Sequence, residues 1–317
     1  MKYAPIVLFV YNRPIHTQAT VEALKANPEA AESELFVFAD GPKAENDEKV
    51  IAVRNYLSSI EGFKNIHLTL RDRNLGLADS IIAGVTEVIN KYGRVIVMED
   101  DLVTAPFFLK YMNDALEKYD GCEKVFAITG YSYFPNGNPK LTETYFLQNM
   151  SSWTWATWSD KWDKFDPDAK GWERMLTDRK YAKKFDHNGC FSLPRMMKAT
   201  MIDHTINSWA VRWCYSAFVN DGLSLFPNRS LVANLGFDGT GTNCEATDSR
   251  DSLGITLADG PVTFFPDDIY ETSTTYSEIN SLYRRFRHTH YRERILFYLG
   301  HINKIPAKIK KCLNGKF

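Results

Sequence analysis

The sequence lacks any long apolar run. No stretch approaches the roughly 20 apolar residues that a transmembrane helix needs, so we expect no segment that spans a bilayer. The N-terminal segment, which starts MKYAPIVLFV, has too short an apolar core and no small-residue cleavage site for a signal peptide. These two absences predict a cytoplasmic protein.

Cysteine is scarce, and repeats and low-complexity segments are lacking. The five cysteines are widely spaced and never form a CxxC pair, which excludes a disulfide framework and a cysteine zinc site. We expect reduced, mostly buried thiols. With 44% hydrophobic and 24% charged residues, the composition is that of an ordinary globular protein.

Positive charge is concentrated at the C-terminus. From Arg284 onward ten Lys or Arg stand against one acid, Glu293, while the rest of the chain is acidic. Apolar and aromatic residues interleave with this basic tail, so it suits peripheral contact with the anionic inner face of a membrane. An equal alternative is a solvated helix whose apolar side docks on the body. Nucleic acid is not an expected partner, because the basic residues are confined to the tail.

The first 130 residues alternate between strand-like and helical patterns. Strands are predicted at residues 5–10, 35–39, 67–70 and 94–98, with helices between them around residues 17–24, 47–60 and 78–91. This alternation predicts an α/β fold with a mostly parallel sheet and right-handed crossovers.

Polar residues follow each of these strands, where ligands of such sheets bind. They are Tyr11-Asn12-Arg13, Asp40-Gly41, Arg71-Asp72-Arg73 and Glu99-Asp100-Asp101. The convergence predicts a nucleotide or phosphate site. Three consecutive carboxylates repel one another unless a cation lies among them, and Mg²⁺ or Mn²⁺ bridging diphosphate oxygens would meet that need. A solvated acidic turn is the alternative.

All seven tryptophans fall between Trp153 and Trp213. Aromatic faces suit the apolar faces of sugar rings, but large aromatic side chains are usually buried for packing. For any single tryptophan the core is therefore favoured. For the cluster as a whole we expect two or three rings to line an acceptor groove.

Several segments resemble a known family of enzymes. VIVMEDDLVTAPFFLKYMNDAL resembles the DXD-type element of eukaryotic N-acetylglucosaminyltransferase I and of related bacterial GT-A glycosyltransferases. PIVLFVYNRP, FVFADG and RDRNLGLADSI resemble the nucleotide-binding segments of that family. SSWTWATWSDKW and SWAVRW resemble its acceptor side, and NLGFDGTGTNC resembles the glycine loop that closes over the donor. These segments cover roughly residues 4 to 244 in the order of the family.

The resemblance implies a GT-A fold, in which a Rossmann-like, mostly parallel central sheet is flanked by helices and joined to an aromatic-rich α+β acceptor half. We expect a nucleotide-sugar-binding half at residues 1–130, an acceptor-binding and lid half at 131–265 and a basic helical tail at 266–317. Three glycines, Gly236, Gly239 and Gly241, also predict a mobile lid on physical grounds, with a plain surface turn as the alternative.

The resemblance also implies site residues. Asp101 would hold Mn²⁺ or Mg²⁺, with Asn243 at the position where the family commonly has histidine. The implied donor contacts are Tyr11, Asn12, Arg13, Asp40, Arg73, Asn74, Gly76, Ser80, Glu99, Asp100, Gly241 and Thr242. The aromatic residues expected to contact the acceptor are Trp155, Trp158 and Trp209.

The base that takes the acceptor proton has two candidates in the sequence. Relatives often carry an aspartate in or just before the SWAVRW helix, where this chain has Asn207, Ser208 and Ala210. Asp203 ranks first as the replacement and Asp160 second, with a capping or surface role as the alternative for each.

The function predicted from these features is metal-dependent transfer of a sugar, with inversion, from a nucleotide-diphosphate donor to a glycan or lipid-linked acceptor. The resemblance points to a uridine diphosphate donor. One alternative is a nucleotidyltransferase, which would require a basic, glycine-rich turn near the N-terminus. The other is a catalytically silent sugar-binding module on the same fold. The Asn207, Ala210 and Asn243 exchanges favour the module.

Overall fold

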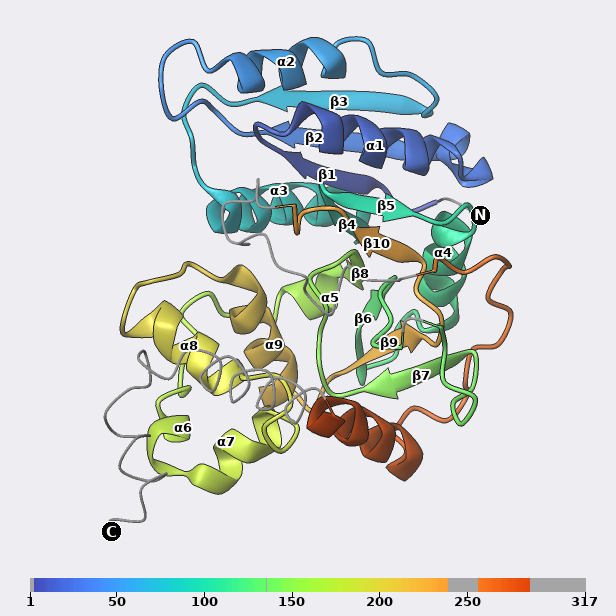
Figure 1. Ribbon diagram of the computed structural model, residues 1–317, viewed down its shortest axis with the longest axis vertical. Coiled ribbons are helices and arrows are strands. Elements are labelled where there is room, and N and C mark those ends of the chain that lie inside the picture. Colours follow the sequence, from blue (N-terminus) through green and yellow to red (C-terminus); the bar gives the residue numbers. More distant parts are fainter. Residues whose placement is uncertain (1–2, 135, 239–255, 286–317) are drawn as a thin grey trace, which may run out of the picture.

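The computed structural model describes residues 3–134, 136–238 and 256–285, and one mixed sheet runs through the middle of the molecule (Figure 1). Its eight strands follow the order β3-β2-β1-β4-β8-β6-β9-β7, and a separate two-stranded sheet pairs β10 with β5. Helices lie on both faces. The predicted α/β class with a mostly parallel central sheet is confirmed.

The first half contains every strand and helix that the sequence pattern predicts. Its strands are β1 (Ile6–Val10), β2 (Glu34–Ala39), β3 (Asn65–Leu70), β4 (Arg94–Glu99), β5 (Leu102–Thr104) and β6 (Val125–Thr129). Its helices are α1 (Pro14–Lys25), the 3₁₀ helix η1 (Pro28–Glu32), α2 (Glu48–Leu57), α3 (Leu77–Tyr92) and α4 (Phe108–Lys118). Strands β1 to β4 are all parallel, so their carboxyl ends meet at one edge of the sheet.

The second half completes the same sheet. Its strands are β7 (Thr144–Leu147), β8 (Trp155–Trp158), β9 (Leu223–Pro227) and β10 (Val232–Asn234). Its helices are α5 (Ser159–Trp162), α6 (Arg174–Thr177), α7 (Arg179–Phe185), α8 (Leu193–Met201) and α9 (Trp209–Val219). Strand β8 lies antiparallel between β4 and β6, so the two expected halves share one sheet.

Alternation along β1 separates the two cores. Ile6 and Leu8 pack with apolar residues of α1, α2 and α4, whereas Val7 and Phe9 pack with apolar residues of α3, α5 and α9. Successive side chains of a strand point to opposite faces, and both faces here are covered by helices. The continuous apolar run in the sequence therefore reflects burial of β1 on both faces.

Helix α3 shows how local sequence sets the edge of the sheet. It begins after Gly76, whose φ of 79° favours glycine, and it ends at Gly93 in the left-handed conformation. Its buried side chains recur at helical spacing, as in Ile81, Val85 and Val88. The two glycines therefore set where α3 begins after β3 and where it ends before β4.

The tryptophans expected to contact an acceptor are core residues in this structure. Trp155, Trp158 and Trp209 are 1%, 4% and 4% exposed. The Trp155 ring centroid lies 5.3 Å from that of Trp209 and 6.0 Å from that of Trp213. Trp155 and Trp209 pack on the α9 side of the sheet, and Trp158 packs in the core on the opposite face. Trp153, by contrast, is only half-buried.

The C-terminal region docks on the body as far as the structure describes it. A helix at residues 273–285 buries Ile279 in the main core, and its Glu278 pairs with Lys140 at 2.6 Å. Most of the basic tail, from residue 286 on, lies outside the described residues. Among the residues described, no helix is both long and apolar enough to cross a membrane.

Of the cysteines, Cys190 and Cys214 are buried and Cys122 is half-buried. Burial raises the pKa of the Cys214 thiol to about 12. Cys244 and Cys312 lie outside the described residues.

We predict that Trp155→Ala lowers the free energy of unfolding by about 3–5 kcal/mol, the usual cost of truncating a fully buried large aromatic side chain. Urea titration followed by circular dichroism would measure it. Trp153→Ala, two residues away and only half-buried, is the matched control and should cost less. Equal losses would contradict the assignment of Trp155 to the core.

Candidate functional site

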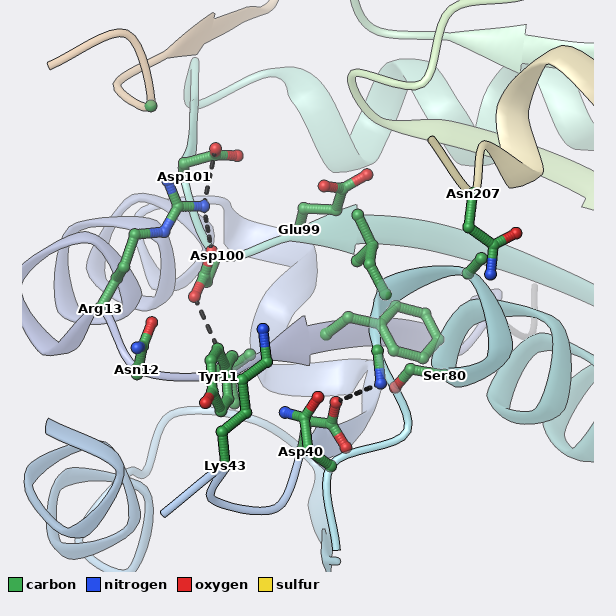
Figure 2. A pocket seen from close by; sticks show the side chains of 17 residues that line it. Tyr11, Asn12, Arg13, Asp40, Lys43, Ser80, Glu99, Asp100, Asp101 and Asn207 are labelled. Carbon is green, nitrogen blue, oxygen red and sulfur yellow. Dashed lines mark hydrogen bonds and ion pairs between the residues drawn. The ribbon is translucent and has the colours of Figure 1, made fainter. Parts of the chain in front are cut away.

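A cavity of about 290 Å³ lies at the carboxyl ends of β1, β2 and β4 (Figure 2). Its wall brings together residues from all three strand ends, from the start of α3 and from the second half of the chain. The lining residues are Phe9, Val10, Tyr11, Asn12, Arg13, Asp40, Lys43, Asn74, Gly76, Leu77, Ala78, Ser80, Glu99, Asp100, Asp101, Asn207 and Gly236. The predicted convergence of polar strand ends is therefore present for β1, β2 and β4, whereas the residues after β3, Arg71-Asp72-Arg73, do not line the cavity.

Arg13 holds two of the three consecutive acids. Its Nη2 donates to Asp100 Oδ1 at 2.6 Å and to Asp101 Oδ2 at 2.8 Å. Arg13 precedes Pro14, the first residue of α1, so the turn after β1 is fixed by the start of that helix. The cation that the acidic triplet requires is supplied here by the chain itself.

Hydrogen bonds to the backbone carbonyl oxygens of Asp100 and Asp101 also hold these residues in place. The Thr20 hydroxyl of α1 donates to the carbonyl oxygen of Asp100 at 2.9 Å, and the Leu235 amide donates to the carbonyl oxygen of Asp101 at 2.8 Å. The Asp100 side chain also accepts from the Tyr11 amide at 3.4 Å. With exposed fractions of 5% and 9%, Asp100 and Asp101 are therefore held rigidly.

The charges of the triplet act strongly on one another. Burial raises the pKa of Asp100, and the positive charge of Arg13 opposes that rise. Burial also lowers the pKa of Arg13, but the charges of Asp100 and Asp101 more than offset this, so its net shift is upward. For Glu99, burial and the charges of Asp101 and Asp100 raise the pKa to about 8, against the opposing effect of Arg13.

Asp40 anchors the loop at the other end of the cavity. Its Oδ1 accepts from the amides of Gly41 and Leu75 at 3.0 and 2.9 Å, and its Oδ2 accepts from Gly76 at 2.9 Å. A carboxylate offers about four acceptor positions, and the described residues occupy three of those on Asp40, which leaves one on Oδ2. The buried Asp40 therefore shapes the cavity and keeps one acceptor for it.

Gly236 reaches the site from the second half of the chain. Strand β10 pairs with β5 and delivers the following residues to Asp101. A Cβ atom on Gly236 would lie 2.2 Å from Asp101 Oδ2 and 3.1 Å from Arg13 Nη1. Only glycine leaves room for the acid and its partner at this point.

The cavity gathers most of the predicted donor residues. Tyr11, Asn12, Arg13, Asp40, Asn74, Gly76, Ser80, Glu99 and Asp100 all line it, together with Asp101. Arg73 does not line it. Its side chain is exposed, while its backbone packs against Gly41, where an added Cβ would lie 2.3 Å from the Arg73 carbonyl carbon. Gly241, Thr242 and Asn243 lie outside the described residues.

The two carboxylates expected as the base are not brought to this cavity. Asp203 is exposed beyond α8, and both its oxygens accept from Lys198 Nζ at 2.5 and 2.7 Å. Asp160 follows β8, whose Trp158 pairs with Arg94 at the start of β4, so it lies at the opposite edge of the sheet from Glu99. The second half contributes Asn207 to the cavity wall instead.

Sequence reasoning missed Lys43 as a lining residue and considered Asn207 and Gly236 without placing them in the site. Lys43 stands in the turn after Asp40-Gly41-Pro42, and exposed lysines are common in such turns. The signal available in the sequence was its position four residues beyond the end of β2. Asn207 ends the loop before α9, where Ser208 caps the helix by accepting from the Val211 amide at 3.3 Å.

The donor set fits a divalent ion only in part. Carboxylate oxygens suit Mn²⁺ and Mg²⁺. However, the Arg13 nitrogen occupies the space between Asp100 and Asp101, and no group of three or more His, Cys, Asp or Glu side chains in the described residues could hold a metal ion. An ion here would take Asp101 as its main protein ligand and would need further oxygens from a bound ligand or water.

Comparison of the sequence with protein families and with curated proteins finds no match. Among solved structures, S. aureus TarS (residues 1–349) is similar with a TM-score of 0.41 and 11% identity over 72% of this chain and 59% of that one. A longer S. aureus TarS structure gives 0.39 and 11%, over 73% and 37%. The Pyrobaculum calidifontis mannosyltransferase PcManGT, in complex with GDP-Man and Mn²⁺, gives 0.37 and 12%, over 68% and 75%. The similarity thus spans less than two thirds of either TarS chain.

We predict that Gly236→Ala lowers the free energy of unfolding by about 1–3 kcal/mol, because the added methyl group overpacks the contact with Asp101 and Arg13. Chemical denaturation would measure the change. Gly260→Ala is the matched control, since a Cβ there meets nothing within 4 Å. An unchanged midpoint for Gly236→Ala would show that the chain around this residue is not held against Asp101.

Glu99 should make stability depend on pH in metal-free buffer. Its folded-state pKa is raised from 4.5 to about 8, so the stability it contributes is present below pH 4.5 and is lost as the pH rises through 8. We therefore expect Glu99→Gln to melt above the wild type at pH 9 by roughly 2–4 °C, with the difference vanishing near pH 4.5. Differential scanning calorimetry in EDTA would measure it. The exposed Glu87→Gln is the control, and a pH-independent difference for Glu99→Gln would contradict the raised pKa.

Proposed function

We propose that this chain is a GT-A-type glycosyltransferase that moves a sugar from a nucleotide-diphosphate donor, a uridine diphosphate sugar, to a glycan or lipid-linked acceptor. One observation carries the proposal. A buried acidic pair with its own cation stands at the carboxyl ends of parallel strands, inside a cavity whose other end holds a second buried carboxylate, Asp40. Ligands of open α/β sheets bind in such a crevice.

The cavity residues suggest how the donor lies. The remaining acceptor position on Asp40 Oδ2 suits the imide N–H of uracil, and the guanine N–H would serve equally well. The acidic triplet stands away from Asp40 in Figure 2, with Tyr11 and Lys43 between them. The diphosphate would then lie over Tyr11, and the sugar near Glu99 and Asn207.

The chain supplies orientation and charge to the proposed reaction. Asp101 is the residue that would hold Mn²⁺ or Mg²⁺, which when bound would neutralise charge on the leaving diphosphate. Arg13 keeps Asp100 and Asp101 in place before the donor arrives. The predicted stereochemistry is inversion, from a single displacement in which a carboxylate accepts the acceptor proton.

The proposed acceptor site is inferred from the chemistry of nearby aromatic and basic residues. Trp153 lies just before β8, at the end of the sheet where Glu99 ends β4. It and Phe237 are half-buried, with ring centroids 5.6 Å apart, and their aromatic faces could contact a sugar. The basic tail beyond Arg284 would bring the enzyme to an anionic membrane face that carries a lipid-linked acceptor.

One observation favours a second candidate, a sugar-nucleotide-binding module without activity. Within the described residues, the second half of the chain contributes Asn207 and no carboxylate to the cavity wall. Such a module would bind the donor and neither hydrolyse nor transfer it, so turnover of bound donor separates the two candidates.

We predict that one uridine or guanosine diphosphate sugar, at about 100 times its dissociation constant, stabilises the wild type by about 2.7 kcal/mol, and that Mn²⁺ increases the effect. A thermal-shift panel of nucleotide diphosphates and their sugars, with and without Mn²⁺, would measure it. Asp101→Ala should lose the metal-dependent part, because it removes the proposed ligand.

Asp160→Ala is the matched control for that panel, since Asp160 lies at the opposite edge of the sheet. No response of the wild type to any nucleotide would remove the nucleotide site. Stabilisation without turnover would favour the silent module. A product that keeps the anomeric configuration of the donor would rule out the single displacement.

A further inference from the structure

Two cationic side chains line the cavity, and within the described residues Arg13 is the one that forms an ion pair. Four acidic side chains line the wall with Arg13 and Lys43. Arg13 is committed to Asp100 and Asp101 at 2.6 and 2.8 Å. Lys43 is exposed, and no carboxylate in the described part of the chain forms an ion pair with it. Its ammonium group is thus available to a ligand.

The ammonium group of Lys43 lies over the ring of Tyr11. The Lys43 ammonium lies 5.8 Å from the centroid of the Tyr11 ring. The Tyr11 amide in turn donates to Asp100 Oδ2. In Figure 2 the Lys43 side chain extends over Tyr11, from the Asp40 end of the cavity toward the acids.

We propose that Lys43 is a binding residue for the diphosphate of the nucleotide ligand. This inference rests on the proposed function. A nucleoside diphosphate brings two or more negative charges into a wall that already carries four acidic side chains. Lys43 offers three N–H donors on a flexible stem, between the carboxylate that suits the base and the acids that suit a metal ion.

The chemistry predicts which part of the ligand Lys43 recognises. An ammonium group interacts with phosphate oxygens and offers little to a nucleoside. Its contribution should therefore appear with UDP and be absent with uridine. It should also be larger without metal, when no other free cation neutralises the phosphates, and should weaken as salt screens the charges.

Isothermal titration calorimetry of the full chain with UDP and uridine, in EDTA and then with Mn²⁺, would test the proposal. If the nucleotide panel selects guanine, GDP and guanosine replace them. We expect Lys43→Met to weaken UDP binding about tenfold or more in EDTA, as expected for loss of a charge-assisted hydrogen bond. Uridine binding should stay unchanged, and Lys43→Arg should keep most of the UDP affinity.

Lys49→Met is the matched control, because Lys49 is an exposed lysine of α2 that does not line the cavity. Wild-type UDP binding with no loss in Lys43→Met would overturn the role of Lys43 alone. An equal loss of UDP and uridine would also overturn it, because Lys43 would then shape the cavity instead of binding phosphate. Absence of UDP binding by the wild type would overturn the proposed function together with this inference.

Discussion

The site depends on the pairing of one guanidinium group with two consecutive carboxylates. Asp100 and Asp101 follow the end of β4, where burial and the charge of Asp101 would otherwise disfavour the charged form of Asp100. Arg13 bridges them from the start of α1, and the Leu235 amide holds the Asp101 backbone from the second half of the chain. Segments that are far apart in the sequence therefore meet at this ion pair, and its geometry leaves only glycine at position 236.

Much of this was predictable because the first half obeys simple periodic rules. The run from Ile6 to Val10 is apolar throughout, since β1 is buried on both faces, and the polar residues begin where the strand ends. Parallel pairing of β1 with β2 and β4 then requires the strand ends to meet at one edge. The cavity therefore follows from the strand pattern, and the resemblance to GT-A enzymes adds the expected roles of Arg13, Asp40 and Asp101.

The remainder depends on facts that a local pattern does not contain. The sequence around a tryptophan is the same whether its ring packs in a core or contacts a ligand. Trp155 is buried because the rings of Trp162 in α5 and Trp209 in α9 pack against it. Asp160 lies within the tryptophan-rich segment of the sequence. Because β8 runs antiparallel to β4, however, Asp160 lies at the opposite end of the sheet from Glu99. Lys43 sits in an irregular turn, so only the tertiary fold shows that it lines the cavity.

The charge balance of the cavity also constrains how any nucleotide diphosphate could bind. Four acids and two cations leave the wall negative before a ligand arrives, even with Glu99 protonated. A dianionic ligand must then bring a cation with it or use one that is not already paired. An Arg13 Nη2 that turned toward phosphate would release Asp101, and a released Asp101 is the oxygen ligand that a divalent ion needs. Binding of the nucleotide and of the ion should therefore favour each other, because each removes the charge that opposes the other.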